Sequence, residues 1–386
     1  MFPVVGEVVI RTNGGTLTVN APADTVNHYA MLNEATITAV AETDCYHEYG
    51  TVKGQLNITK GKVVLESKAN VGFVNVTATT SDVIAIEIKS GADYGRLTCE
   101  NETILAAVAT ASNVPTEKTM KTEAGTVAIV DNIAYTDITS AISTFEATKN
   151  STFELFVDIK NAAASGNQLP IKMPEGATFD GHGYSLEGNV ALYINSKGGT
   201  VKNLTFHMTE NKSTRSQAQV DRYGEAGVGT LSSLYGIALS GKAIIEGCTF
   251  DTAEWDALQI TPVAGAEIVI KNNVFNTSKP EMFGQIRWIH IQSNNADDFA
   301  VSIKDNDFYE AKNLLSTAGQ AVEIYYPVNA SKVEISGNYF DGVKSASDVS
   351  KADLDGYYAC IGTGGTFYNN ANELLFNGLR TTPNNK

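Results

Sequence analysis

The sequence predicts an all-β protein made of two consecutive repeat arrays, a short N-terminal β-solenoid and a longer one after it. Two sets of alternating apolar residues, each recurring at its own spacing, lead to this prediction. With 386 residues, of which 43% are hydrophobic, the chain can bury an extended core. A single repeat unit cannot cover its own apolar face, so successive units must stack on one another.

The first array, which we assign to residues 1–90, has the tighter repeat. Its apolar alternations centre on Leu17, Ile37, Leu56 and Val74, at intervals of 20, 19 and 18 residues. β-Branched residues separated by Gly or Asn are typical of short strands joined by tight corners. The sequence therefore predicts a short β-solenoid module with one coil per repeat.

Two His-Tyr groups recur in phase with this first array. His28-Tyr29 is answered one repeat later by His47 and Tyr49. Because stacked strands lie ~4.8 Å apart, we expect His28 above His47 and Tyr29 beside Tyr49. Such a ladder has two interpretations, a structural stack of half-buried rings, which we favour, and a sugar- or metal-binding site.

The segment 91–125 shows no sustained period and is predicted to be a linker or capping segment. Within it, residues 104–111 are expected to form a helical turn or cap. Order resumes with a predicted β-hairpin over residues 126–135. The hairpin turns at Asp131 and Asn132, because both residue types favour turn geometry.

An amphipathic helix is expected directly after the hairpin. Asp137 can cap its N-terminus, and Ile138, Ala141, Ile142 and Phe145 fall on one face. A helix in front of a solenoid closes the apolar end of the stack, which would otherwise expose unpaired strand edges.

The second array repeats one short phrase. An apolar alternation runs into Asn, Asp or Gly and closes on a phenylalanine, at positions 206, 250, 275, 308 and 340. Each copy predicts a strand, a corner whose Asn or Gly tolerates left-handed backbone geometry, and an aromatic side chain turned inward. The last three intervals of 25, 33 and 32 residues fit a stack whose outer loops vary in length.

A known family is similar to this second part. The hairpin, the helix and the following strands, with Pro-Glu-Gly-Ala-Thr-Phe-Asp-Gly-His-Gly-Tyr-Ser-Leu at 174–186, resemble the beginning of right-handed parallel β-helix proteins of the pectin-lyase-like superfamily, especially bacterial surface or secreted ones. The resemblance covers residues 126–370. It implies a right-handed parallel β-helix of roughly eight coils over residues 126–386, with a small N-terminal capping helix. It also implies an extracellular or cell-surface location, for which we expect a signal peptide to have been removed. His182 is expected to be a turn residue there.

A candidate site comes from aligning the second strand of each coil by its inward-facing apolar residues. Side chains alternate between faces along a strand, so the residues between these apolar positions must point outward. The outward residues expected to bind a ligand are Trp288, Gln259, Gln292, Tyr325, Tyr358, Arg287 and Asp256. Glu323 and His290, expected one rung apart in the same column, are the acid and base if the protein is an enzyme.

Aromatic rings beside amides and a carboxylate suit a sugar, because rings stack on pyranose faces while polar groups bind hydroxyls. We therefore expect a non-catalytic carbohydrate-binding or adhesion protein of the bacterial cell surface, with a polysaccharide or glycan as its partner. One alternative is a polysaccharide-degrading hydrolase or lyase acting in the same groove, and another is a structural spacer. Other surface proteins are a further class of partner.

Composition argues against several other functions. The net charge of -15 disfavours nucleic acids and anionic membranes as partners. The longest apolar stretch, 104–110, is far shorter than the ~20 residues of a membrane-spanning helix, so no membrane insertion is expected. Cys45, Cys99, Cys248 and Cys360 form no Cys-x-x-Cys pair, so we expect no metal and no cofactor. Their spacing leaves a Cys45–Cys99 disulfide open.

Overall fold

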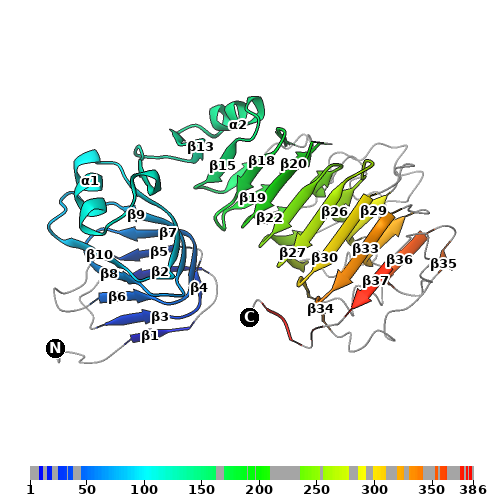
Figure 1. Cartoon of the computed structure of the whole chain (residues 1–386), viewed down its shortest axis with the longest axis horizontal. Helices are drawn as coiled ribbons and strands as arrows, with labels where there is room; N and C mark the ends of the chain where they lie inside the picture. Colours follow the sequence, from blue (N-terminus) through cyan, green and yellow to red (C-terminus); the bar gives the residue numbers. More distant parts are fainter. Residues whose placement is uncertain are drawn as a thin grey trace. The chain divides into compact units, whose positions relative to one another are not determined.

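The structure is a computed structural model, and it describes the following residues: 8–11, 15–19, 25–32, 34–37, 45–161, 169–188, 190–195, 197–208, 235–252, 255–277, 286–292, 299–309, 320–325, 330–341, 353–354, 357–362, 374–377, 380 and 382–384. Strands dominate these residues, and most of them run parallel to their neighbours (Figure 1). The chain forms two compact units. The N-terminal unit comprises Met1–Asp137 with His182–Tyr184, and the C-terminal unit comprises Ile138–Gly181 with Ser185–Lys386.

The N-terminal unit contains two parallel sheets between which the chain alternates. Sheet I has the order β1 (Val8–Ile10), β3 (Val26–His28), β6 (Cys45–Glu48), β8 (Gly61–Leu65) and β10 (Ile84–Ile88). Sheet II has the order β12 (Thr119–Lys121), β11 (Asp93–Cys99), β9 (Asn70–Val76), β7 (Thr51–Ile58), β5 (Glu34–Ile37) and β2 (Thr16–Val19), and β4 (Met31–Leu32) also pairs with β7. Side chains of β7 alternate strictly between buried and half-buried, as a strand with one face on a core requires.

The predicted register of this repeat holds in part. Leu56 lies opposite Val74, as the spacing predicted. Leu17, however, lies opposite Ala35 rather than Ile37. The shift is two residues, so the same side-chain face remains buried, since faces repeat every second residue.

The segment 91–125, predicted to be a linker or cap, is a folded part of the N-terminal unit. It contains β11, helix α1 (Glu102–Ala111), the short 3₁₀ helix η1 (Thr116–Lys118) and β12. The side chain of Asn101 caps α1 by accepting hydrogen bonds from two backbone N–H groups of its first turn. Helix α1 buries Ile104, Leu105, Val108 and Ala109 in the core of this unit.

The hairpin and the second helix form as predicted. Strands β13 (Ala128–Val130) and β14 (Ile133–Tyr135) pair antiparallel around Asp131 and Asn132, which both have left-handed backbone angles. Helix α2 (Ile138–Ala147) buries Ala141 and Phe145. The Phe145 ring packs edge-on against Phe153 and Phe179, with ring centroids 5.3 and 6.0 Å away.

The C-terminal unit contains three sheets that the chain visits in turn. Sheet III contains β15 (Thr152–Leu155), β18 (Ala177–Asp180), β21 (Gly199–Lys202), β24 (Ala243–Glu246), β27 (Glu267–Lys271), β30 (Phe299–Lys304), β33 (Ala330–Ser336) and β37 (Leu374–Asn377). Sheet IV contains β16 (Ile159–Asn161), β19 (Ser185–Gly188), β22 (Thr205–Met208), β25 (Thr249–Thr252), β28 (Val274–Asn276), β31 (Asp307–Phe308) and β34 (Tyr339–Phe340). Sheet V contains β17 (Leu169–Met173), β20 (Val190–Ile194), β23 (Tyr235–Leu239), β26 (Trp255–Ile260), β29 (Ile286–Gln292), β32 (Gln320–Tyr325), β36 (Tyr357–Gly362) and β35 (Asp353–Leu354). This all-β, mostly parallel topology is compatible with a β-helix or solenoid.

The repeated phenylalanines stack into one ladder inside the C-terminal unit. Successive ring centroids from Phe206 through Phe250, Phe275 and Phe308 to Phe340 lie 4.8, 5.0, 4.7 and 4.5 Å apart, and the rings are nearly parallel. The residues at the preceding corners have φ between 53° and 64°; they are Asn203, Gly247, Asn272, Asp305 and Gly337. The predicted corner and the inward aromatic residue are therefore confirmed.

A second ladder, of asparagine side chains, was not predicted. Asn273, Asn306 and Asn338 are buried at equivalent places one residue after the corner. Each side-chain amide donates to a backbone carbonyl of sheet III, at Ile245, Ile270 and Ile303 respectively. Each side-chain oxygen accepts from the backbone N–H one coil earlier, at Cys248, Asn273 and Asn306. Cys248 occupies the place at which the Asn ladder begins.

Candidate functional site

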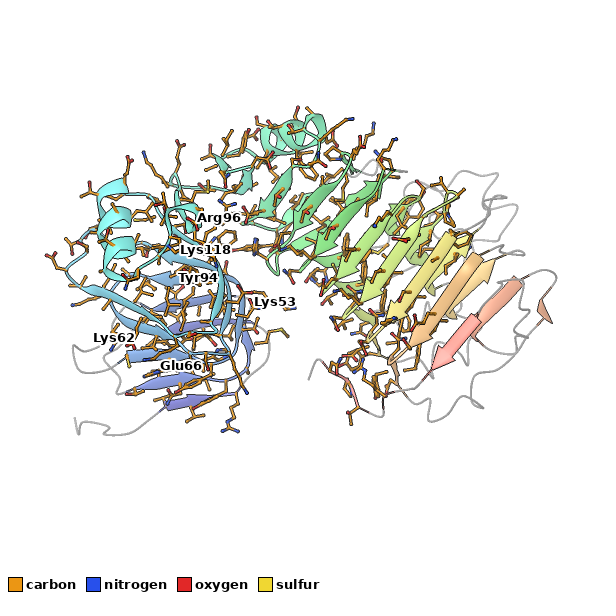
Figure 2. All side chains as sticks on the ribbon, in the orientation of Figure 1. Lys53, Lys62, Glu66, Tyr94, Arg96 and Lys118 are labelled. Carbon is orange, nitrogen blue, oxygen red and sulfur yellow. The ribbon has the colours of Figure 1, made fainter. Side chains whose placement is uncertain are left out.

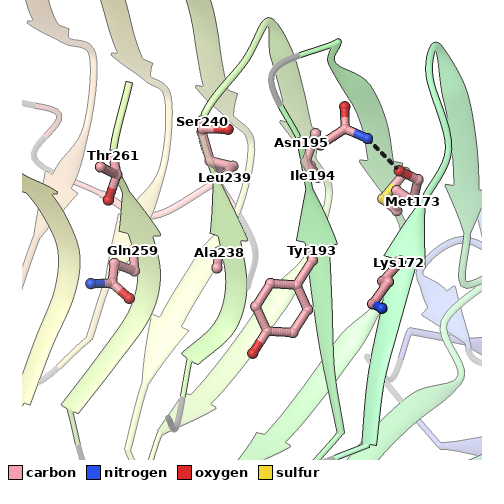
Figure 3. Close-up of a pocket in the computed structure, with 10 residues that line it drawn as sticks. All are labelled: Lys172, Met173, Tyr193, Ile194, Asn195, Ala238, Leu239, Ser240, Gln259 and Thr261. Carbon is pink, nitrogen blue, oxygen red and sulfur yellow. Dashed lines mark hydrogen bonds between the residues drawn. The ribbon is translucent and has the colours of Figure 1, made fainter. Parts of the chain in front are cut away.

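A concavity formed by described residues lies on the outer face of sheet V. It has a volume of about 530 Å³ and is lined by Lys172, Met173, Tyr193, Ile194, Asn195, Ala238, Leu239, Ser240, Gln259 and Thr261. These residues come from β17, β20, β23 and β26 and from the positions just after these strands. Figure 3 shows two rows, with Lys172, Tyr193 and Gln259 in one and Asn195, Ser240 and Thr261 in the other. We call this concavity the sheet V groove.

Strand register produces the first row. Lys172 pairs with Tyr193, Tyr193 with Ala238, and Ala238 with Gln259. The same column continues through His290 to Glu323, as the alignment of the sequence predicted. The register between Ile194 and Leu239 is kept although residues 209–234 lie between β22 and β23.

Sequence reasoning missed the first two members of this column. Lys172 lies between Ile171 and Met173, and Tyr193 lies between Leu192 and Ile194, so the apolar alternation needed to find them is present. These two residues were not predicted because the alignment of second strands started at β23, after the long interval that follows Met208.

The polar groups of the groove are partly fixed. The amide of Asn195 donates to the Met173 carbonyl at 3.5 Å, and its oxygen accepts from the Lys197 backbone N–H at 2.8 Å. Tyr193 and Tyr235 meet edge-on, with ring centroids 6.2 Å apart. The pKa of Tyr235 is raised to about 12, mainly by burial and to a smaller extent by the neighbouring Tyr193. Burial also raises the pKa of Tyr193. Both phenols therefore stay neutral at physiological pH and can donate hydrogen bonds.

Beside the groove, His290 binds a carboxylate, but not the one predicted. Its Nδ1 lies 2.9 Å from Oδ2 of Asp256, and the two side chains are 6% and 4% exposed. A carboxylate only accepts, so Nδ1–H donates to it and the basic lone pair of the neutral ring lies on Nε2. Glu323 is the strand neighbour of His290, as predicted, and its side chain lies outside the described residues.

The expectation that Trp288 points outward is wrong. Trp288 is fully buried, and its ring centroid lies 6.4 Å from that of Phe275 and 5.8 Å from that of Phe308. The strict alternation of faces breaks at this step, because the adjacent Trp288 and Ile289 are both buried, as are Ala257 and Leu258. The break turns Trp288 toward the phenylalanine ladder and leaves Asp256 on the side of His290.

The remaining predicted residues fall where only the backbone is described. Arg287 lies opposite Asp256, and Gln292 lies opposite Tyr325, in parallel register. Tyr358 does not continue the column, because β36 runs antiparallel to β32 and places it opposite Ile324. The side chains of Arg287, Gln292, Tyr325 and Tyr358 lie outside the described residues.

The N-terminal His/Tyr ladder forms for the tyrosines only. Tyr29 and Tyr49 stack with ring centroids 4.4 Å apart. The expectation that His28 lies above His47 is wrong, since His28 pairs with Glu48 and His47 with Asn27. The offset of one residue places the two imidazoles on opposite faces of sheet I. His28 is fully buried, and its Nδ1 lies 2.8 and 2.9 Å from the two carboxylate oxygens of Glu48.

Cys45, Cys99 and Cys248 are not joined in disulfides, so the Cys45–Cys99 disulfide does not form. Within the described ranges, no three His, Cys, Asp or Glu side chains are placed to hold a metal ion. No helix among the described elements is long and apolar enough to cross a membrane.

Comparisons with protein-family models, with curated proteins and with solved structures found no match. The function must therefore be argued from the groove and its neighbours.

Proposed function

We propose that the protein is a non-catalytic carbohydrate-binding or adhesion protein of the bacterial cell surface that binds glycan in the sheet V groove. In this proposal the C-terminal unit is a right-handed parallel β-helix of the pectin-lyase-like kind, and the N-terminal unit is a short β-solenoid. The proposal rests on one observation. The ring of Tyr193 lines the same groove as a row of amide and hydroxyl groups.

The chemistry of the groove fits a sugar in three ways. The Tyr193 ring offers an apolar surface on which a pyranose face can stack. Gln259, Asn195 and Thr261 offer donors and acceptors for hydroxyl groups. Lys172 adds a positive charge at one end, which favours an acidic sugar over a neutral one. The volume also lies within the ~300–1,000 Å³ typical of small-ligand sites.

The test is titration of the protein with neutral and acidic oligosaccharides by calorimetry. Tyr193→Ala should lower affinity about tenfold, since an aromatic stacking contact contributes ~0.5–1.5 kcal/mol beyond the area it buries. Tyr193→Phe should keep most of the affinity, because it retains the ring. Lys172→Gln should weaken only the acidic ligands.

Tyr309→Ala is the matched control, because Tyr309 follows β31 in sheet IV and is absent from the groove lining. Equal affinities for the wild type, Tyr193→Ala and Tyr309→Ala would refute binding in this groove. Absence of binding to every glycan tested would favour the structural spacer instead.

The second candidate is a polysaccharide-degrading enzyme, and the Asp256–His290 pair is the observation that favours it. Asp256 would orient the imidazole so that Nε2, which is buried in this structure, takes or gives a proton once a substrate reaches it. The test is the rate at which the protein shortens a polysaccharide. If His290→Gln lowers this rate about 100-fold and Tyr309→Ala leaves it unchanged, the function is catalysis rather than binding.

The cellular setting follows from the same proposal. A chain that binds a polysaccharide or glycan, or another surface protein, would act outside the cell. Extracellular labelling of intact cells with an antibody against the chain tests this location directly.

A further inference from the structure

On the outer face of sheet I, a thiol, an imidazole and a carboxylate lie in contact one after the other. The glycan proposal does not use these three side chains. Cys45 Sγ lies 2.7 Å from His47 Nε2, and His47 Nδ1 lies 2.7 Å from Glu66 Oε1. Cys45 and His47 alternate with the buried Tyr46 and Glu48 on β6, so they share one face of the strand. Glu66 directly follows β8, the next strand of the sheet.

The order of the contacts fixes the roles of the three groups. Glu66 only accepts, so Nδ1–H of His47 donates to it, and Nε2 is left to face the thiol. Nε2 can then accept the proton of the Cys45 thiol, after which the imidazolium lies between a thiolate and a carboxylate. Enzyme nucleophiles are commonly activated by such an arrangement, in which a base lies within hydrogen-bond distance of the nucleophile and a third group orients the base.

The surroundings leave this thiol partly exposed and place charged side chains near it. Cys45 is partly exposed, and the His47 and Glu66 side chains are 21% and 19% exposed. Lys62 lies opposite Cys45 in the register of β8 and adds a positive charge on this side. Figure 2 labels Lys62 and Glu66, which lie near the two ends of β8. Glu87 on β10 forms an ion pair with Lys62, with 3.3 Å between Oε2 and Nζ, and a second ion pair with Lys89.

We propose that Cys45 is a reactive thiol, activated by His47 and Glu66, that undergoes exchange with low-molecular-weight disulfides. His47 Nε2 takes the thiol proton, and the Cys45 thiolate attacks one sulfur of the small disulfide. The Cys45–sulfur bond forms while the disulfide bond of the reagent breaks. The leaving thiolate then takes the proton from His47, so one disulfide and one thiol give a mixed disulfide and a small thiol.

The stacked rings of Tyr29 and Tyr49 adjoin this site. The Tyr49 ring lies parallel to His47, with centroids 5.9 Å apart, and Arg11 lies 5.5 Å above Tyr29. This aromatic surface next to His47 favours disulfides that carry an apolar or anionic group over compact uncharged ones.

The experiment measures how fast the full-length protein reacts with 2-hydroxyethyl disulfide and with iodoacetamide, both uncharged, by intact mass spectrometry between pH 5 and pH 9. Cys45→Ser subtracts the reaction of the other cysteines. Because the thiolate is the nucleophile, the wild type should react at pH 6 about tenfold faster than His47→Gln, and Glu66→Gln should lie between them.

The matched control is His207→Gln, which removes another partly exposed histidine that contacts a carboxylate, Asp251. It should leave the rate unchanged, and circular dichroism should show that all variants are folded. Lys62→Gln separates a general charge effect from the His47 contact, and it should slow the reaction less than His47→Gln does. A wild-type profile that matches His47→Gln at every pH would overturn the proposal, as would modification that persists in Cys45→Ser at the wild-type rate.

Discussion

At the scale of single residues, the corner of each coil in the C-terminal unit is fixed by two positions with different tasks. The first, such as Asn272 or Gly337, takes a left-handed backbone conformation that most residues resist. The second, such as Asn306, binds the coils before and after it through its side-chain amide. The first task could be read from the Asn, Asp and Gly pattern. The second could not, because a strand pattern does not tell whether an amide is buried.

Cys248 interrupts the asparagine ladder, and Cys248→Asn should extend it. The new amide would donate to the Val201 carbonyl, which the thiol now faces at 3.8 Å, and its oxygen would accept from the Leu204 backbone N–H. Because a net hydrogen bond contributes ~0.5–1.5 kcal/mol, we expect the free energy of unfolding to rise by about 1 kcal/mol. Urea denaturation measures it, with Cys248→Ala as the control. An Asn variant less stable than the Ala variant would contradict the prediction.

The pKa of His207 should report the negative charge of the neighbouring Asp251. The hydrogen bond to Asp251, opposed by burial, raises the pKa of His207 above its ordinary value of 6.5. A raised folded-state pKa adds stability that is present below pH 6.5 and is lost as the pH rises through the folded-state pKa. NMR titration should therefore show the His207 midpoint falling in Asp251→Asn. The stability lost in that variant should be larger at pH 5.5 than at pH 8.5, and the opposite order would refute the assignment.

At the scale of elements, the two helices were predicted with different success for a physical reason. Helix α2 has a clear apolar face, and it forms where expected. For helix α1 the sequence predicted only a helical turn or cap within a linker or capping segment, because its Ala and Thr content weakens the contrast between faces. Asn101, whose side chain accepts from Thr103 and Ile104, was the available signal for its start.

The contribution of α2 to the C-terminal unit can be measured through Phe145. Phe145→Ala removes a fully buried ring that packs on Phe153 and Phe179. We expect the free energy of unfolding to fall by about 3–5 kcal/mol, as is typical of buried Phe→Ala changes. Chemical denaturation measures the loss, and Phe145→Leu, which keeps most of the volume, should lose less. A loss below 1 kcal/mol in Phe145→Ala would show that α2 contributes little.

At the scale of the whole molecule, the repeats predicted a mostly parallel all-β fold, and they predicted only part of the side-chain arrangement on sheet V. Spacing located the phenylalanine ladder and the column through Gln259, His290 and Glu323 because parallel coils keep register. It misplaced Trp288, because one break in the alternation of faces moves a side chain from solvent to core. It also misplaced Tyr358, because the reversal of β36 depends on chain direction, which no residue pattern encodes.

The division into two units predicts two steps in thermal unfolding. The units have separate ladders and separate capping helices, and stacked coils depend mainly on their immediate neighbours. We expect differential scanning calorimetry to show two transitions, of which Phe145→Ala lowers one and leaves the other unchanged. A single transition that the variant shifts as a whole would show that the units unfold as one.

The register that β20 and β23 keep across residues 209–234 also has an evolutionary consequence. A stretch of chain can lengthen, shorten or change its sequence at this point without altering the coils on either side. The interval ends at β23, one of the strands that line the sheet V groove, so natural selection can vary this stretch of chain while the scaffold is inherited unchanged. Homologues of this chain should therefore differ most in length between Met208 and Tyr235, and least between Tyr235 and Phe275.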